Sequence, residues 1–275
     1  MSQLSSTCAV DQRDCMKKYP RISIVTPSFE QGNFIEETIL SVLSQEYPDL
    51  EYLVMDGGSS DTTLNVLKKY SGKITWWSEP DHGQTDAINK GLRRATGSIV
   101  GYLNADDLLL PGALKKMAEA FIGNSQTWWV TGKCRIVDEE NQEIRKPITV
   151  YKNTLLRWNS FSFLLMTNYI SQPATFWRRE ALESIGYLDE RLRYVMDYEY
   201  WLRLYSKCPP IFIPEYLAAF KIHRDSKTTS TGHKDVYIAE EKVVVQRYAR
   251  SRPQMALHNA HRSLMTFAYS LMNRG

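Results

Sequence analysis

The chain lacks the features that mark membrane-spanning and disulfide-rich proteins. Its longest apolar cluster, residues 161–166, is far shorter than the ~20 residues that a membrane-spanning helix needs. Residues 1–19 contain no apolar stretch of the kind found in secretory signal peptides, so we expect no signal peptide. The four cysteines lie far apart, without the spacing of a zinc site or a disulfide framework, which predicts reduced thiols in a cytoplasmic protein.

The chain also lacks an excess of charge of one sign. Its net charge of +3 is too small to indicate a nucleic-acid-binding protein, and no nucleic-acid-binding motif is present. With 275 residues, of which 43% are hydrophobic and 24% charged, the chain can form one large globular domain, with or without an extension.

Short apolar runs alternate with amphipathic segments along the chain. In the first half, strands are expected at 21–26, 51–55, 73–77 and 98–102, and helices at 34–45, 61–70 and 85–95. This order predicts an α/β fold with a mostly parallel central sheet flanked by helices. In the second half, strands are expected at 128–137, 143–150, 171–177 and 215–222, and helices at 178–185, 197–206 and, broken near Pro253, 233–273.

The most distinctive stretch is the acidic segment at residues 103–107, Leu-Asn-Ala-Asp-Asp, which follows a predicted buried strand. Acidic side chains at the carboxyl end of a strand lie on the ligand-binding edge of an open α/β sheet. Adjacent carboxylates are costly to bury without a partner, and a divalent cation that also binds phosphate oxygens is a common one. Alone, the segment allows two interpretations: a metal–diphosphate site, or a solvated turn in which Asp107 caps the next helix.

Two further predicted strands also end in polar residues. Thr26 and Asp56 stand at their carboxyl ends, and Asn104 follows the strand before the acidic segment. Because the carboxyl ends of parallel strands meet at the same edge of a sheet, we expect these three residues to lie close together. The sequence therefore predicts one ligand site at this edge.

Six segments resemble, in the same order, motifs of glycosyltransferase family 2, whose members have the GT-A fold. They are Ser-Ile-Val-Thr-Pro-Ser-Phe at 23–29, Thr-Ile-Leu-Ser-Val-Leu-Ser-Gln at 38–45, Val-Met-Asp-Gly-Gly-Ser-Ser-Asp-Thr at 54–62, Asp-Ala-Ile-Asn-Lys-Gly at 86–91, Asn-Ala-Asp-Asp at 104–107 and Asp-Tyr-Glu-Tyr-Trp-Leu-Arg-Leu at 197–204. The resemblance implies a Rossmann-like nucleotide-binding half at 21–110 and an acceptor-binding half at 111–228. A flexible tail at 1–20 and a C-terminal helical extension at 229–275 complete the expected organisation.

The resemblance implies a nucleotide pocket at the ends of the first strands. Phe29 would contact the base, and Asp56 would accept a hydrogen bond from it, the usual role when the base is uracil. A pocket built for such a bond rejects bases that lack the donor. Asp86 would either contact the base or ribose or be a solvated helix residue. The full set expected to bind the nucleotide sugar is Thr26, Pro27, Phe29, Glu30, Asp56, Gly57, Asp86, Asn104 and Ala105.

The acidic segment departs from the family's common pattern, because Asn104 stands where the family more often has Asp. Asn can still hydrogen-bond a ribose hydroxyl, but it leaves one negative charge fewer near a metal. The resemblance implies that Asp106 binds Mn²⁺ or Mg²⁺, and that His223 is either a second metal ligand or a structural residue. The metal would stabilise the charge on the leaving diphosphate, while Asp107 has no assigned role.

Asp197 is the candidate general base. The family carries an acidic pair at the start of a helix in this region, and here Met196 takes the first position and Asp197 the second. Glycosyl transfer with inversion needs one carboxylate that takes the proton of the acceptor hydroxyl. Asp197 could instead cap the helix, and Glu199 is an alternative base that we expect to face elsewhere. Trp177, on the acceptor side, either stacks on a sugar or packs in the core.

The resemblance implies an inverting enzyme that moves a sugar from a nucleotide-diphosphate donor, most simply a UDP-sugar, to a hydroxyl acceptor. Such an acceptor would be a growing cell-surface polysaccharide or a lipid-linked saccharide. The alternatives are a sugar-nucleotide-binding protein without transfer activity and a nucleotidyltransferase, although residues 27–32 lack the basic side chains of the latter's loop. The basic, amphipathic C-terminal helices leave three arrangements open: packing on the domain, homo-oligomer formation, or peripheral contact with the inner face of the plasma membrane.

Overall fold

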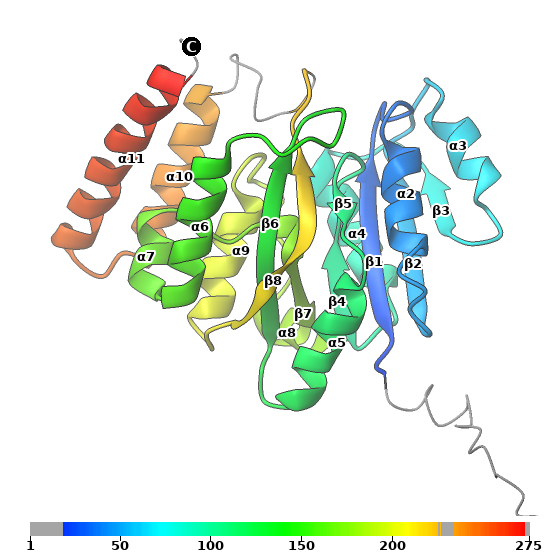
Figure 1. Cartoon of the computed structure of the whole chain (residues 1–275), viewed down its shortest axis with the longest axis horizontal. Coiled ribbons are helices and arrows are strands. Elements are labelled where there is room, and N and C mark those ends of the chain that lie inside the picture. The colour runs from blue at the N-terminus through cyan, green and yellow to red at the C-terminus, as the bar shows by residue number, and fades with distance from the viewer. Residues whose placement is uncertain (1–18, 225, 227–233, 273–275) are drawn as a thin grey trace, which may run out of the picture.

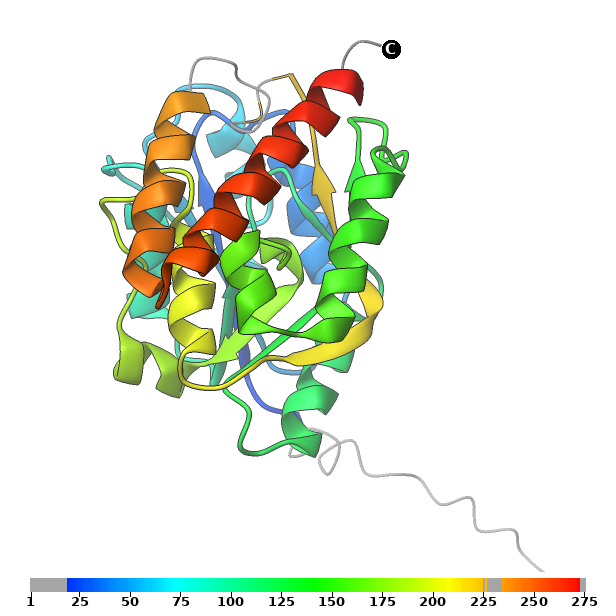
Figure 2. The ribbon, with the colours of Figure 1, turned by 90° about the vertical axis from the view of Figure 1, so that its left-hand side faces the viewer.

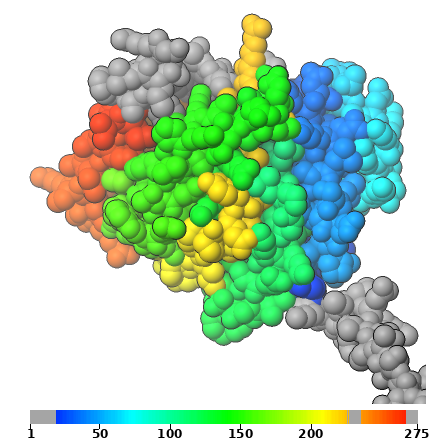
Figure 3. Space-filling model, in the orientation of Figure 1, coloured from blue at the N-terminus to red at the C-terminus, as the bar shows by residue number. Residues whose placement is uncertain are grey.

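The computed structural model describes residues 19–224, 226 and 234–272. The predicted tail at residues 1–20 lies almost entirely outside this range. The described chain folds around one central β-sheet. The N-terminal elements lie at one end of the molecule and the last two helices, α10 (Lys234–Tyr248) and α11 (Arg252–Met272), lie at the other (Figure 1, Figure 3).

The sheet has eight strands in the order β3-β2-β1-β4-β7-β6-β8-β5. Their bounds are Ile22–Ser28 (β1), Leu50–Asp56 (β2), Thr75–Ser78 (β3), Ile99–Tyr102 (β4), Leu108–Leu109 (β5), Trp129–Val137 (β6), Thr175–Arg178 (β7) and Ile211–Lys221 (β8). β1 pairs in parallel with β2 and β4, as do β2 with β3 and β6 with β8. β7 is antiparallel to β4 and β6, and β5 is antiparallel to β8. The prediction of a mostly parallel sheet is confirmed.

The strand order reverses beside β1, which has β2 on one side and β4 on the other. Open α/β sheets bind ligands at such a switch point, outside the carboxyl ends of the strands. β2 ends at Asp56, and Asn104 follows the end of β4 by two residues. The sheet topology therefore brings the predicted polar strand ends to one edge.

Helices cover both faces of the sheet (Figure 1). Side chains alternate along β1, so Ile22 and Ile24 pack with helices on one face and Val25 with helices on the other. Besides α10 and α11, the helices are α2 (Ile35–Leu43), α3 (Thr63–Lys69), α4 (Gln84–Arg94), α5 (Ala113–Gly123), α6 (Lys146–Trp158), α7 (Phe161–Met166), α8 (Arg179–Ile185) and α9 (Met196–Tyr205). A 3₁₀ turn, η1 (Gln172–Ala174), takes the place of the start of the predicted strand at 171–177.

The prediction of a strand at residues 143–150 is wrong. One isolated bridge joins Val137 to Glu143, and α6 begins three residues further on. The β-branched residues in this stretch favoured a strand. However, a proline suits the first turn of a helix, and Ile148 and Leu155 are buried one heptad apart on the same side of α6.

The helices α10 and α11 pack on the rest of the protein (Figure 2). Val244 and Val245 of α10 belong to the core. In α11, His261 Nε2 lies 2.6 Å from the Tyr151 hydroxyl of α6, and His258 Nδ1 lies 3.1 Å from the carbonyl oxygen of Met166. Within the described residues, no helix is both long and apolar enough to cross a membrane. The division of the chain at residues 20 and 228 stays a prediction.

Candidate active site

Asp56 holds the turn that follows β2. Its carboxylate is buried and accepts hydrogen bonds from the backbone amides of Gly58 (3.2 Å) and Ser59 (2.9 Å) and from the hydroxyls of Ser59 (2.5 Å) and Ser78 (2.6 Å). Three of these bonds go to Oδ2 and one to Oδ1, which leaves acceptor capacity on Oδ1 alone. Any bond from Asp56 to a base would therefore use Oδ1.

Phe29 lies beside this turn and is 59% exposed. A Cβ atom placed on Gly57 would come within 3.3 Å of the Phe29 ring and 2.6 Å of Asp81 Oδ2. A flat ligand can approach the backbone here only because residue 57 has no side chain. Asp81 is a member of this surface that the sequence prediction missed, since it lies between motifs, three residues before α4.

Two other predicted residues are committed to internal contacts. The Thr26 hydroxyl is buried and lies 3.0 Å from that of Tyr52. The Glu30 carboxylate accepts hydrogen bonds from the backbone amide (2.7 Å) and hydroxyl (3.0 Å) of Ser60. These side chains shape the turn after β1, so that contact between Thr26 and a nucleotide would involve its backbone.

Asp86 occupies the first turn of α4 and is mostly buried. It accepts a hydrogen bond from the His82 amide (3.0 Å) and pairs with Lys90 (3.2 Å). Burial raises the pKa of Asp86, but these two interactions outweigh it and lower the pKa overall. Asp86 is therefore held as an ionised carboxylate close to the turn that contains Asp81.

Asn104 and Asp107 tie the acidic segment together. Asn104 Oδ1 accepts a hydrogen bond from Gln84 Nε2 (2.7 Å), and Asn104 Nδ2 donates to Asp107 Oδ2 (3.0 Å). Asp107 is wholly buried and also accepts a hydrogen bond from the Lys221 amide of β8 (3.0 Å). Burial and the neighbouring charge of Asp106 raise the pKa of Asp107. Asp107 thus joins the acidic segment to β8 rather than capping a helix in solvent.

Asp106 and His223 face each other across the end of the sheet. Asp106 Oδ2 lies 3.0 Å from His223 Nε2, and the Phe34 ring packs on the imidazole with centroids 4.0 Å apart. The Asp106 side chain is 21% exposed, whereas that of His223 is 1% exposed. The Asp106 oxygen and the His223 nitrogen, 3.0 Å apart, could bind the same Mn²⁺ or Mg²⁺ ion. Phosphate oxygens and water would take the other coordination positions of that ion. Within the described residues, no group of three His, Cys, Asp or Glu side chains forms a complete metal site.

Asp197 lies in the first turn of α9 and is partly buried. Its Oδ1 accepts a hydrogen bond from the Tyr198 amide (2.6 Å) and its Oδ2 one from Asn168 Nδ2 (3.3 Å). Burial raises the pKa of Asp197, and the bond from Tyr198 and the charge of Lys152 oppose the rise. A carboxylate with a raised pKa in such a place is suited to accept a proton.

Lys152 and Asn168 interact with the candidate base Asp197, and the sequence prediction missed both. Lys152 belongs to α6, where a strand was expected for the preceding residues, so nothing placed its charge near Asp197. The Asn168 Oδ1 atom is buried and has no hydrogen-bond partner among the described residues. Asn168 therefore contacts Asp197 through a hydrogen bond, and Lys152 acts on it through its charge.

The Tyr102 hydroxyl is influenced by the charges of both acidic groups. Burial, followed by the charges of Asp197 and Asp107, raises the pKa of Tyr102. The backbone carbonyl of Tyr102 accepts a hydrogen bond of 2.5 Å from Gln172 Nε2. The end of β4 thus lies within electrostatic range of both the acidic segment and the start of α9.

Two residues with alternative roles, Glu199 and Trp177, both have structural contacts. The Glu199 carboxylate is buried and receives bonds from Arg203 (2.6 Å) and the Tyr248 hydroxyl (2.7 Å), away from Asp197. Trp177 is wholly buried and packs against Trp201, with ring centroids 5.7 Å apart. Trp177 is therefore a core residue and does not stack on a sugar.

The fold and its acidic edge define the class of protein, an α/β protein of the GT-A glycosyltransferase type. The sequence profile described as "Glycosyl transferase family 2" matches residues 23–186, more than half of the chain, and the chain belongs to this family. The match ends before Asp197 and His223, so the roles of these two residues rest on geometry and on the resemblance of their own segments.

Several relatives share most of the chain. It is 26% identical over 216 residues to an uncharacterized glycosyltransferase of Rickettsia typhi. The aligned region covers 77% of this chain and 67% of that relative. It is 27% identical over 226 residues to the GalNAc(5)-diNAcBac-PP-undecaprenol beta-1,3-glucosyltransferase of Campylobacter jejuni. The aligned region covers 79% of this chain and 70% of that relative.

Solved structures share the fold at lower identity. A mannosyltransferase of Pyrobaculum calidifontis, in complex with GDP-Man and Mn²⁺, has a TM-score of 0.67 and 20% identity, covering 88% of this chain and 69% of that one. The 1–349 fragment of S. aureus TarS, in complex with UDP, has a TM-score of 0.59 and 18% identity, covering 82% and 64%. The chain spans 44% of a longer TarS chain. These likenesses show the GT-A fold.

Proposed function

We propose that this protein is a metal-dependent, inverting glycosyltransferase that moves a sugar from a UDP-sugar to a hydroxyl acceptor. The observation that carries the proposal is the pairing of Asp106 with His223 at the edge of the sheet, together with the separate carboxylate of Asp197 in the first turn of α9. This arrangement supplies a cation site for the donor diphosphate and a separate carboxylate for the acceptor.

The donor would bind along the edge of the sheet. The base would lie against Phe29 and Gly57, and Asp56 Oδ1 would accept its N–H. Asn104, oriented by Gln84, would hydrogen-bond the ribose. Asp106 and His223 would hold the metal, which when bound supplies positive charge that stabilises the leaving diphosphate. A UDP-bound relative and a relative bound to GDP-Man and Mn²⁺ support a nucleotide-sugar donor and a metal.

Asp197 would act on the acceptor. As the acceptor oxygen attacks the anomeric carbon, Asp197 takes the hydroxyl proton, and the bond from that carbon to the diphosphate breaks on the opposite face. The configuration at the anomeric carbon is therefore inverted. Tyr198 and Asn168 hold the two carboxylate oxygens, and partial burial makes the carboxylate a stronger base than a solvated one.

The name of one relative, rather than the geometry of the site, supports the acceptor class that we propose. The C. jejuni relative is named for an acceptor on undecaprenyl diphosphate, a lipid carrier. We propose an acceptor of the same kind, a lipid-linked saccharide or growing polysaccharide for the cell surface, so that the reaction would occur at the inner face of the plasma membrane.

The donor and metal are tested by thermal shift with UDP, GDP and their sugars, with and without Mn²⁺. A ligand at 100 times its Kd stabilises the folded protein by about 2.7 kcal/mol, or ~5–10 °C in Tm for a protein of this size. We expect the largest shift with a UDP-sugar and Mn²⁺. Asp106→Asn should lose the part that depends on Mn²⁺, whereas Glu140→Gln, an exposed carboxylate, should keep it. If no nucleotide shifts Tm, or if the Mn²⁺ effect survives in Asp106→Asn, the donor site proposed here is wrong.

A further inference from the structure

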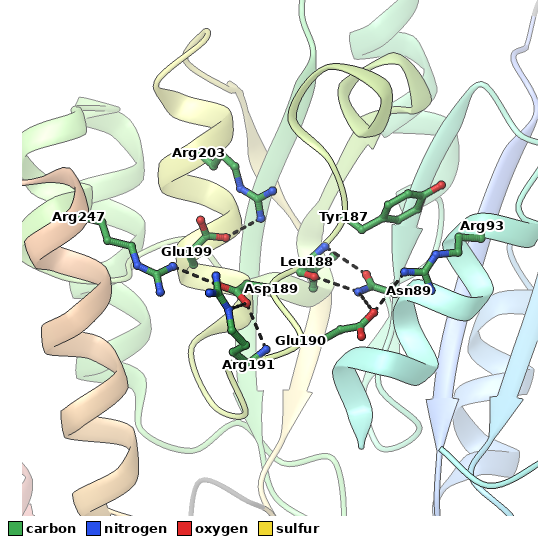
Figure 4. Close-up of a pocket in the computed structure, with 10 residues that line it drawn as sticks. All are labelled: Asn89, Arg93, Tyr187, Leu188, Asp189, Glu190, Arg191, Glu199, Arg203 and Arg247. Carbon is green, nitrogen blue, oxygen red and sulfur yellow. Dashed lines mark hydrogen bonds and ion pairs between the residues drawn. The ribbon is translucent and has the colours of Figure 1, made fainter. Parts of the chain in front are cut away.

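The loop at residues 186–195 connects α8 to α9 and leads directly to Asp197. A shallow pocket of about 440 Å³ opens over this loop, and its charged side chains pair with one another (Figure 4). Figure 4 shows Arg247 of α10 on one side of the loop and Asn89 and Arg93 of α4 on the other. The loop is therefore held between a helix of the donor half and a helix of the C-terminal extension.

On the side of the nucleotide-binding half, side chains of α4 form hydrogen bonds with the backbone of the loop. Asn89 is buried, donates to the Leu188 carbonyl (2.9 Å) and accepts from the Leu188 amide (3.1 Å). The Thr85 hydroxyl donates to the Leu192 carbonyl (3.0 Å). α4 also carries Gln84, which orients Asn104 at the donor site. These bonds fix the first part of the loop relative to the donor site.

On the other side, α10 binds the last part of the loop. Glu240 accepts hydrogen bonds from two consecutive backbone amides, Arg193 to Oε1 and Tyr194 to Oε2, each of 2.9 Å. About two turns further along α10, Arg247 pairs with Asp189 (3.1 Å) and the Tyr248 hydroxyl donates to Glu199 of α9 (2.7 Å). Hydrogen bonds from Arg191 and Arg247 to Asp189 lower its pKa well below the usual range, so this ion pair persists at neutral pH.

We propose that Glu240 is a positioning residue for Asp197. The two amides that Glu240 binds lie three and four residues before Asp197, where the loop enters α9. A carboxylate that accepts both amides fixes this entry, and through the short first turn of α9 it fixes where Asp197 points. Reacting groups must be placed within fractions of an ångström, so a small shift of the base lowers the rate without altering donor binding. The inference rests on the proposed role of Asp197.

The test compares the steady-state kinetics of Glu240→Gln and wild type, with the donor concentration varied up to saturation. Glutamine keeps the size of the side chain but retains one acceptor oxygen and turns an NH₂ group toward the second amide. We expect kcat to fall about tenfold, with an unchanged KM for the donor and an unchanged Tm shift on adding UDP. Asp235→Asn, an exposed carboxylate on the same helix, is the matched control and should leave kcat unchanged.

A second variant separates positioning from mere anchoring. Glu240→Asp keeps both acceptor oxygens but withdraws them by one methylene, so its kcat should lie between wild type and Glu240→Gln, and it serves alone if the Gln variant does not fold. A lower Tm with wild-type kcat in the folded variant would show that Glu240 only anchors α10, and would overturn the inference. Asp197→Asn is measured in parallel: full transfer by that variant overturns the proposed function, whereas an inactive Asp197→Asn beside a fully active Glu240→Gln overturns the positioning role alone.

Discussion

The charge of Lys152 lies close to the carboxylate that we propose as the base. Burial raises the pKa of Asp197, and Lys152 is one of the groups that oppose the rise. Burial in turn lowers the pKa of Lys152, which Asp197 counteracts. Lys152 thus helps to keep Asp197 ionised, and only the ionised form can take a proton from the acceptor.

This pair predicts a pH dependence. As pH falls through the pKa of Asp197, the base becomes protonated and kcat falls. Lys152→Met removes a charge that favours the ionised form, so the pKa of Asp197 should rise and the acidic limb of the kcat profile should move to higher pH. Lys146→Met, which changes an exposed lysine at the start of the same helix, is the control. Coincident acidic limbs for both variants and wild type would contradict the electrostatic role of Lys152.

Among the elements, α4 packs unusually close to the sheet. A Cβ atom on Gly91 would lie 2.3 Å from a methyl carbon of Val25 in β1 and 3.1 Å from Met55 in β2. α4 carries both Asp86 and the residues that hold the loop before Asp197. The close approach of α4 to β1 therefore sets the distance between the donor site and that loop.

Gly91→Ala should therefore destabilise the protein. In an ordinary helix interior this change is stabilising by roughly 0.5–1 kcal/mol, but overpacking a core costs about 1–3 kcal/mol. We expect the second effect to win, and denaturant unfolding measures the difference. Gly123→Ala, at the end of α5, is the control and should be neutral or stabilising, because the added carbon would meet no other part of the described protein within 4 Å beyond its chain neighbours and its own helix backbone. Equal stability of the two variants would show that the sheet yields to the added methyl group.

The elements of the first half were predictable, and those of the second half only in part. Strands and helices alternate up to β4 with clear turn residues, so both the parallel sheet and its acidic edge followed from the pattern. The segment of α6 carries β-branched residues that favour a strand locally, and only its packing against the core selects the helix. Because this segment was expected to form a strand, the sequence did not indicate that the charge of Lys152 lies near Asp197.

Contacts between distant elements also escaped prediction. His223 reaches Asp106 because β8 pairs with β6 and β5, across 117 residues of sequence. The backbone bonds of Glu240 to residues 193 and 194 cross 47 and 46 residues. No local pattern encodes such pairings, so the resemblance to the family suggested the first, and the second came from the structure alone.

At the scale of the whole molecule, two halves of the sheet have separate tasks in our account. The parallel half with β1, β2 and β4 offers the surface for the nucleotide, and the acidic segment lies at its boundary with the mixed half. The mixed half supplies His223 and the Asp197 carboxylate of α9. Helix α10 forms hydrogen bonds with the loop that leads to α9. Donor binding and proton removal are thus assigned to different parts of the chain and should be separable by mutation.

The measurement that tests the central claim most directly is the kcat of Asp197→Asn for transfer at saturating donor and acceptor. Asn is nearly isosteric with Asp but cannot take a proton at neutral pH. Loss of a general base costs ~10²–10⁴ in rate, so we predict a fall of that size, together with a wild-type Tm shift on adding UDP and Mn²⁺. Transfer by Asp197→Asn at the wild-type rate would contradict the account.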